Sequence, residues 1–146
     1  MDIKKTARYD QAYLRIAREW GLLSHCNRKK VGAIIVKDRM IISDGYNGTP
    51  SGFENCCEND NGETHWYVLH AEANAILKVA SSTQSCDGAT LYITMSPCKD
   101  CSKLIHQAGI KRVVYQSGYK DMSGVEFLLK AGVKVDNINL DEIDSN

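Results

Sequence analysis

Residues 89–101 read ATLYITMSPCKDC, an apolar and partly β-branched run that ends in a proline and two cysteines. The run from Ala89 to Met95 predicts a buried β-strand, and residues 98–108 have the pattern of a helix. Pro97 suits the first turn of that helix, because the N–H that proline lacks would have no partner there. The stretch therefore predicts a strand leading into a helix that carries Cys98 and Cys101 on one face of its first turn.

The segments on either side continue this alternation of strands and helices. Apolar spacing predicts helices over about 6–25, from 71 to about 80, and over 125–131, with strands over 31–36, 40–43, 112–115 and 133–135. The first two of these strands form a hairpin, and the acidic residues 141–146 are expected to fray. We therefore predict a single domain over residues 1–146, an α/β fold with three α/β/α layers around a central mixed five-stranded sheet.

The composition is that of an ordinary globular protein, with 43% apolar and 25% charged residues. Eighteen basic and 18 acidic residues give a net charge of zero, so no global field attracts nucleic acid or an anionic membrane. The sequence has no signal peptide and no apolar run long enough to span a bilayer, so we expect a cytoplasmic protein without a membrane partner. In that compartment, six cysteines favour metal binding over disulfides.

A second motif, His70-Ala71-Glu72, opens the helix expected from residue 71. Two cysteine thiolates and one imidazole supply three metal ligands and leave the fourth tetrahedral position to water, as in a catalytic zinc site. The positive end of the helix dipole favours the thiolates that bind metal, and Glu72 is left to act as a general base. His-x-Glu followed by Pro-Cys-x-x-Cys is the signature of zinc-dependent nucleobase deaminases.

Each motif has a simpler interpretation when taken alone. A Cys-x-x-Cys pair can be a redox pair or half of a structural zinc site, and Glu72 can be an ordinary first-turn carboxylate. A non-catalytic zinc-binding interaction module is the alternative from a different functional class. Glu72 argues against it, because a purely structural metal has no use for a non-ligand carboxylate beside an open coordination position.

With these motifs the chain resembles the deoxycytidylate (dCMP) deaminases of the cytidine deaminase superfamily, from residue 31 to about 135. The resemblance rests on residues 31–33, 45–50, 70–76, 96–101 and 104–111. It implies hydrolysis of dCMP to dUMP, the precursor for thymidylate synthesis, with zinc held by His70, Cys98 and Cys101 and protons moved by Glu72. A tRNA adenosine deaminase and a free cytidine deaminase are the alternatives within the superfamily. Zero net charge disfavours the first, and the Gly45–Gly48 segment followed by a long cysteine-bearing loop disfavours the second.

The same resemblance implies further roles for individual residues. The Ala71 backbone N–H binds the pyrimidine carbonyl, the Ser96 carbonyl receives the amino group, and Asn47 binds the sugar. Enzymes of this family are typically activated by dCTP and inhibited by dTTP, and Mg²⁺ can accompany the triphosphate effector. They are often homohexamers, so the resemblance implies a homohexamer or another homo-oligomer. The resemblance places that allosteric site at Gly45, Tyr46, Asn47, Gly48 and Asn74.

The phosphate of dCMP requires a cationic partner. The densest basic cluster is residues 28–30, where Arg28 and Lys30 are the candidates, although such a run is often only a solvated surface. The alternative is Lys111-Arg112 with the nearby tyrosines. Tyr119, in the loop after the fourth strand, is a candidate to lie over the nucleotide.

The remaining cysteines raise the question of a second, structural zinc. Some dCMP deaminases bind one between the region before the first strand and the long loop, and Cys26 and Cys56 match that pattern. No clear four-ligand spacing is present, so free buried thiols are the alternative. The candidate ligands are Cys26, Cys56, Cys57 and His65.

Overall fold

The computed structural model describes residues 2–145, and its helices and strands alternate as the sequence predicts. The first half contains α1 (Ile3–Gly21), the hairpin of β1 (Gly32–Lys37) and β2 (Met40–Tyr46), and α2 (Ala71–Ala80). The second half contains β3 (Thr90–Met95), α3 (Lys99–Gln107), β4 (Arg112–Ser117), α4 (Ser123–Lys130), β5 (Lys134–Asn137) and α5 (Leu140–Asp144). No helix in this described part of the chain is both long and apolar enough to cross a membrane.

The five strands form one mixed sheet in the order β2-β1-β3-β4-β5, which confirms the predicted sheet. β1 pairs antiparallel with both β2 and β3, whereas β3, β4 and β5 run parallel. The parallel strands require crossover connections, and α3 and α4 provide them. The cysteine motif therefore lies at the carboxyl end of the central strand β3, where α3 begins.

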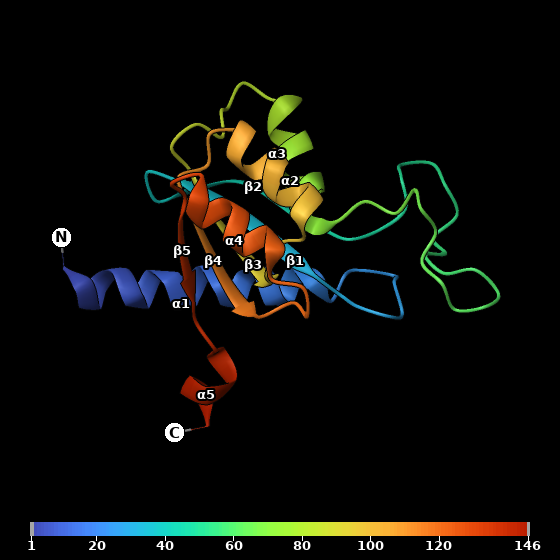
Figure 1. Cartoon of the computed structure of the whole chain (residues 1–146), viewed down its shortest axis with the longest axis horizontal. Helices are drawn as coiled ribbons and strands as arrows, with labels where there is room; N and C mark the ends of the chain where they lie inside the picture. Colours follow the sequence, from blue (N-terminus) through green and yellow to red (C-terminus); the bar gives the residue numbers. More distant parts are fainter. Residues whose placement is uncertain (1, 146) are drawn as a thin grey trace.

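Helices cover both faces of the sheet and complete the three predicted layers (Figure 1). The larger core cluster lies between the sheet and α2, α3 and α4, and includes Ile35, Leu91, Ile105 and Leu128. The smaller cluster lies on the opposite face, where Leu14 and Ala17 of α1 pack with Ile34, Val114 and Leu140. The two faces are thus buried by different helices, and the zinc motifs belong to the face covered by α2 and α3.

The C-terminal segment differs from the sequence prediction. Residues 140–144 form the short helix α5, whereas we expected residues 141–146 to fray; Asn146 lies outside the described residues. Asn139 caps this helix by accepting hydrogen bonds from the N–H groups of Asp141 and Glu142. Ion pairs with α1 and the burial of Leu140 also hold it, so its order comes from tertiary contacts that a short acidic segment does not reveal.

A buried ion-pair network joins α1 to the sheet. Asp10 accepts hydrogen bonds from Arg112 at 2.9 and 2.8 Å and from the Tyr92 hydroxyl at 2.6 Å. Arg112 also donates to Asp136 at 2.9 Å. Asp10 is only 4% exposed, so removing it leaves part of a buried cationic network without its counter-ion.

Asp10→Ala is therefore expected to lower the free energy of unfolding by about 3 kcal/mol, measured by urea titration. Asp141→Ala is the matched control, because its 3.7 Å ion pair with Arg18 is solvent-exposed and contributes less than about 1 kcal/mol. Equal losses for the two variants would contradict a structural role for the buried network.

The long loop between β2 and α2 extends away from the body of the molecule (Figure 1). Two isolated β-bridges, Gly48 with Leu69 and Glu58 with Thr64, bring its two halves together. A disulfide between Cys26 and Cys57 ties it to the segment before β1. We expected the cysteines to bind metal rather than to form disulfides, and for this pair the structure differs. Only the folded chain brings these two sulfurs together, because they are 31 positions apart in the sequence.

Candidate active site

Two helix starts bring three metal-binding side chains together. His70 is the N-cap of α2 and Cys98 is the N-cap of α3, and both have extended backbone. The helix α3 begins at Lys99, so Pro97 precedes the cap instead of opening the helix as we predicted. In this position the Cys98 sulfur accepts a hydrogen bond from the Cys101 N–H at 3.4 Å. The cap geometry itself therefore fixes the relative placement of the two cysteines.

The geometry of these three side chains fits zinc. The Nδ1 atom of His70 lies 3.6 Å from the Cys98 sulfur and 3.4 Å from the Cys101 sulfur. A tetrahedral zinc with bonds of 2.3 Å to sulfur and 2.0–2.1 Å to nitrogen would separate such ligands by roughly 3.6 Å. Among residues 2–145, this is the group of three or more potential ligands that converges closely enough to hold a metal ion.

The protonation states of the three ligands depend on one another. Hydrogen bonds from Cys101 and His70 lower the pKa of Cys98 to about 4. The pKa of Cys101 is raised, first by its hydrogen bond to Cys98 and second by burial. The hydrogen bond to Cys98 also raises the pKa of His70. Without a metal, the three side chains share protons through these hydrogen bonds. A metal ion bound there would displace those protons, since metal binding to such a site releases protons.

Glu72 lies beside the metal-ligand group without belonging to it. Its side chain is only 3% exposed, and this burial raises its pKa to about 7. A carboxyl group with a pKa near neutrality can both accept and return a proton at physiological pH. The structure therefore brings together three side chains that could hold a metal ion and, beside them, a carboxyl group suited to proton transfer.

A cavity of about 310 Å³ opens over this group. His70, Glu72 and Cys98 lie in its wall with five of the six residues that the sequence predicted for substrate binding. These five are Arg28, Asn47, Ala71, Ser96 and Tyr119. The cavity therefore joins the metal-ligand group to a region that carries basic and aromatic side chains, which suits a small charged and planar ligand.

Comparisons with known proteins agree with this geometry. Residues 7–117 match the family model described as the cytidine and deoxycytidylate deaminase zinc-binding region. The chain belongs to this deaminase family.

Deoxycytidylate deaminase of phage T4 is 37% identical, over 79% of this chain and 82% of its own length. The corresponding enzyme of Mycobacterium phage D29 is 40% identical, over 73% and 93% respectively. The solved structure of cyanophage S-TIM5 dCMP deaminase with dCMP and dUMP is 46% identical over 94% of this chain and 99% of its own, with a TM-score of 0.88.

In this deaminase the three basic side chains of residues 28–30 point to different places, and only Arg28 and Lys29 line the cavity. The Lys30 ammonium donates a hydrogen bond to the Ser24 carbonyl, and Lys30 is not among the cavity-lining residues. Lys29, which we had not proposed, lines the cavity with its ammonium 4.2 Å from the centre of the Tyr119 ring. The alternative cation, Arg112, is engaged by Asp10 and Asp136 and lies outside the cavity. As candidate partners for a phosphate in the cavity, the structure thus favours Arg28 and Lys29 over Lys30 and Arg112.

Asn47 and Ser96 hold the walls of the cavity in place. The Asn47 amide accepts a hydrogen bond from the Val31 N–H and donates one to the Lys29 carbonyl. The Ser96 hydroxyl accepts one from the Tyr119 N–H at 2.6 Å. These contacts leave Asn47 one amide N–H for a ligand, so its predicted contact with a sugar remains chemically open.

The residues implied in allostery lie where β2 meets α2. A Cβ at Gly45 would come within 2.4 Å of the Ala71 carbonyl oxygen, so the strand can approach the helix this closely only at glycine. The Asn74 side chain donates a hydrogen bond to the Tyr46 carbonyl at 2.9 Å. Gly48 pairs with Leu69 in an isolated bridge. These contacts account for the segment structurally, and its regulatory role stays a prediction.

The four candidate ligands for a second metal are not brought together as one group. Cys26 and Cys57 are joined to each other, and Cys56 is exposed with its thiol 3.2 Å from the Glu58 carbonyl oxygen. His65 stacks on the Tyr67 ring at a centroid distance of 4.8 Å. The cysteines of this region instead connect the long loop to the cavity wall, because Cys26 itself lines the cavity.

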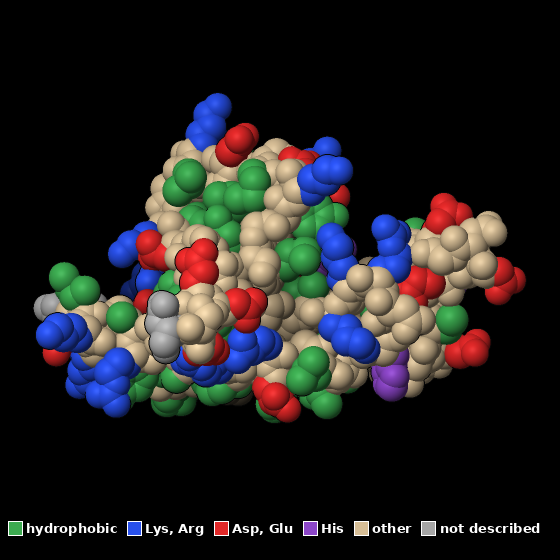
Figure 2. Space-filling view, turned by 90° about the horizontal axis from the view of Figure 1, so that it is seen from below, with side chains coloured by type: hydrophobic (Ala, Val, Ile, Leu, Met, Phe, Trp, Pro, Cys, Tyr) green, Lys and Arg blue, Asp and Glu red, His purple; other side chains and the backbone are tan. Residues whose placement is uncertain are grey.

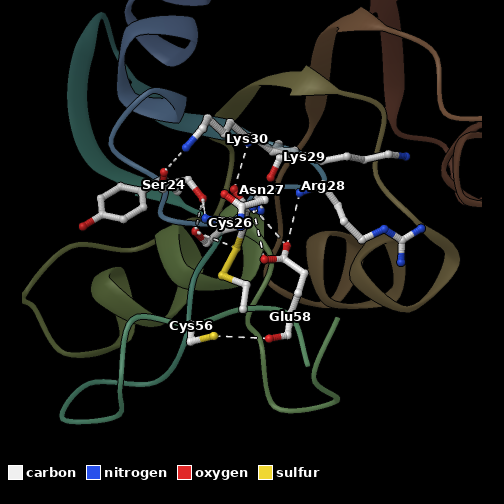
Figure 3. The surroundings of a disulfide bond; sticks show 12 residues. Ser24, Cys26, Asn27, Arg28, Lys29, Lys30, Cys56 and Glu58 are labelled. Carbon is white, nitrogen blue, oxygen red and sulfur yellow. Dashed lines mark hydrogen bonds between the residues drawn. A yellow bond between two sulfur atoms is a disulfide. The ribbon is translucent and has the colours of Figure 1, made fainter. Parts of the chain in front are cut away.

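Sequence reasoning also missed Glu58. Its carboxylate reaches the cavity wall from the long loop and accepts hydrogen bonds from the backbone of residues 27 and 28 (Figure 3). No periodicity or motif marks this residue in the sequence. The only available signal was its position next to a cysteine pair in a loop that must be anchored by something.

Proposed function

We propose that this deaminase hydrolyses dCMP to dUMP. The observation that carries the proposal is the composition of one cavity, with Glu72 and the metal-ligand group in its wall together with Arg28 and Lys29. Neither Arg28 nor Lys29 forms an ion pair with another of the residues 2–145, so both cations are free to meet a phosphate. The cyanophage relative solved with dCMP and dUMP supports the choice of nucleotide.

His70, Cys98 and Cys101 would hold the zinc ion. When bound there, zinc would lower the pKa of a water molecule to near neutrality. Glu72 accepts a proton from the attacking water and passes it to the pyrimidine ring. It then takes the remaining proton from the hydroxyl group now bonded to C4 and delivers it to the amino group, so that the C–N bond breaks, ammonia leaves and the hydroxyl oxygen becomes the new carbonyl. The raised pKa of Glu72 allows one residue to perform both transfers.

The start of α2 is suited to hold the pyrimidine. Ala71 is the first residue of this helix, so its N–H has no partner within the helix and can donate to the ring carbonyl. Ser96 directly follows β3 and lines the cavity beside the cysteine motif, which supports the proposal that its carbonyl receives the amino group. Tyr119 is positioned to cover the nucleotide, because its backbone is tied to Ser96 and its ring faces Lys29.

We further propose the regulation and assembly that are common among dCMP deaminases. On this proposal dCTP, with Mg²⁺, activates the enzyme, dTTP inhibits it, and the active form is a homohexamer or another homo-oligomer in the cytoplasm. The site would include Gly45, Tyr46, Gly48 and Asn74, which couple β2 to the helix that carries Glu72. A second zinc would need the Cys26–Cys57 disulfide to be reduced first, since a bonded pair of sulfurs supplies no thiolate ligands.

The substrate assignment is tested by comparing dCMP, deoxycytidine and dCTP as substrates, each with and without the other nucleotides as effectors. We expect a strong preference for dCMP. Arg28→Ala and Lys29→Ala should each raise KM for dCMP by about 10- to 100-fold, the value of a hydrogen bond to a charged group. Turnover of deoxycytidine should change little in both variants, because it lacks the phosphate.

Lys120→Ala is the matched control for this test, since Lys120 is exposed next to Tyr119 and does not line the cavity. It removes the same charge close to the site without removing a candidate phosphate ligand. Equal losses for dCMP and deoxycytidine in the Arg28 and Lys29 variants would place the phosphate elsewhere. Absence of pyrimidine turnover by zinc-loaded protein would contradict the proposed substrate altogether.

A further inference from the structure

We propose that Glu58 is a positioning residue that fixes the turn at residues 27–29, so that Arg28 and Lys29 face the substrate phosphate. The inference rests on the proposed function, because it requires a substrate that carries a phosphate. In this role, an acidic residue of the long loop helps the enzyme to select nucleotides over nucleosides. None of the motifs that define the metal site includes this residue.

The contacts of Glu58 are directed at the backbone of the turn. One carboxylate oxygen accepts hydrogen bonds from the N–H groups of Asn27 at 3.0 Å and Arg28 at 3.2 Å, and the other lies 3.3 Å from the Asn27 nitrogen. In Figure 3 the side chains of Arg28 and Lys29 extend away from this carboxylate. Glu58 therefore binds the main chain that carries the two cations and leaves their charged groups uncompensated.

It matters that Glu58 bonds to the backbone and not to the cationic side chains, because a carboxylate in an anion-binding cavity would otherwise weaken the binding of the phosphate. A free Glu58 side chain would repel the phosphate or pair with Arg28 and compete for it. Within residues 2–145 no ion pair joins Glu58 to either cation. Its lone pairs are used on two backbone N–H groups that would otherwise need a partner in the cavity wall.

Glu58 is itself held firmly enough to act as an anchor. It pairs with Thr64 in an isolated antiparallel bridge, and the Asn59 N–H donates to the Glu63 carbonyl at 2.8 Å. The preceding residue, Cys57, is bonded to Cys26 on the other side of the contact. The turn is held from its opposite end by Asn47, whose side-chain amide donates a hydrogen bond to the Lys29 carbonyl at 2.8 Å. Two separate elements thus define the conformation of the basic turn.

The direction in which KM for dCMP changes when Glu58 is removed distinguishes a positioning role from a purely electrostatic one. If Glu58 acted only through its charge, then removing it would make the cavity more positive and would lower KM for dCMP. If it positions the turn, its removal releases Arg28 and Lys29 and raises KM for dCMP. Because Cys26 and Cys57 remain joined when Glu58 is changed, the loop stays attached in the variant.

The experiment compares Glu58→Ala and Glu58→Gln with the wild-type enzyme, using kcat and KM for dCMP and kcat/KM for deoxycytidine. We expect Glu58→Ala to raise KM for dCMP by about tenfold, with little change in kcat or in the deoxycytidine reaction. Both variants remove the same charge, but glutamine keeps one carbonyl oxygen that accepts the Arg28 N–H. Glu58→Gln should therefore recover a large part of the affinity for dCMP.

Glu63→Ala serves as the control, since this exposed glutamate of the same loop makes no side-chain contact with the turn, and it should leave both reactions unchanged. A lower KM for dCMP in Glu58→Ala, or an unchanged ratio between the two substrates, would overturn the positioning role. Equal losses for dCMP and deoxycytidine, with falling zinc content, would overturn it as well, because they would indicate general damage. A wild-type enzyme without preference for dCMP would instead overturn the proposed function from which this role follows.

Discussion

Glu72→Gln is expected to lower kcat for deamination by roughly 10²- to 10⁴-fold while the zinc content stays unchanged. The substitution keeps the size of the side chain and removes the group that moves protons. Glu72 is buried, so the amide also avoids the cost of holding a carboxylate away from water, and we expect no loss of stability. The measurement is steady-state turnover of dCMP together with metal analysis of the same protein sample.

Glu126→Gln provides the matched control for this prediction. Glu126 lies in the first turn of α4, as Glu72 lies in the first turn of α2, but it is exposed and away from the cavity. It should retain full activity. Loss of zinc from Glu72→Gln would show that Glu72 is a metal ligand, which would contradict its assignment as a proton-transfer group. Retention of full activity would remove it from the reaction.

Cys101→Ala is expected to abolish zinc binding and, with it, deamination. This residue supplies one of three protein ligands, and its removal leaves only His70 and Cys98 to hold the metal. Binding of a structural zinc contributes about 10–16 kcal/mol in small zinc peptides, so losing one ligand removes a large share of the affinity. Zinc per chain should fall from about one to near zero, measured by metal analysis after dialysis.

Cys86→Ala separates the loss of a ligand from the loss of a buried sulfur. Cys86 is buried to the same degree as Cys101, at 6% exposure, and belongs to the larger core cluster without joining the metal-ligand group. It should retain its zinc and lose at most about 1 kcal/mol of stability through packing. If Cys101→Ala kept one zinc per chain, the metal would have to be held elsewhere in the molecule.

The balance of charge predicted from the sequence is visible on the surface. Figure 2 shows basic and acidic side chains intermixed over the face that carries α1 and α5, with Lys and Arg more frequent near the start of α1. The charge that matters for the proposed substrate is local. It depends on two side chains of one turn, so a net charge of zero carries no information about it.

The sequence by itself determined the alternation of strands and helices, the mixed sheet and the identity of the metal-ligand group. These features depend on local patterns, because apolar periodicity selects each element and a helix start fixes the spacing of Cys98 and Cys101. The short helix α5 was missed because its order depends on ion pairs with α1 in addition to its own Asn139 cap.

Only the tertiary structure decided which basic residues face the cavity. Arg28, Lys29 and Lys30 are consecutive and chemically alike, and no local pattern distinguishes them in an irregular turn. Their directions are set by partners distant along the chain, since Asn47 and Glu58 hold the backbone of the turn. The Cys26–Cys57 bond has the same origin, because a cross-link forms between side chains that the fold brings within reach.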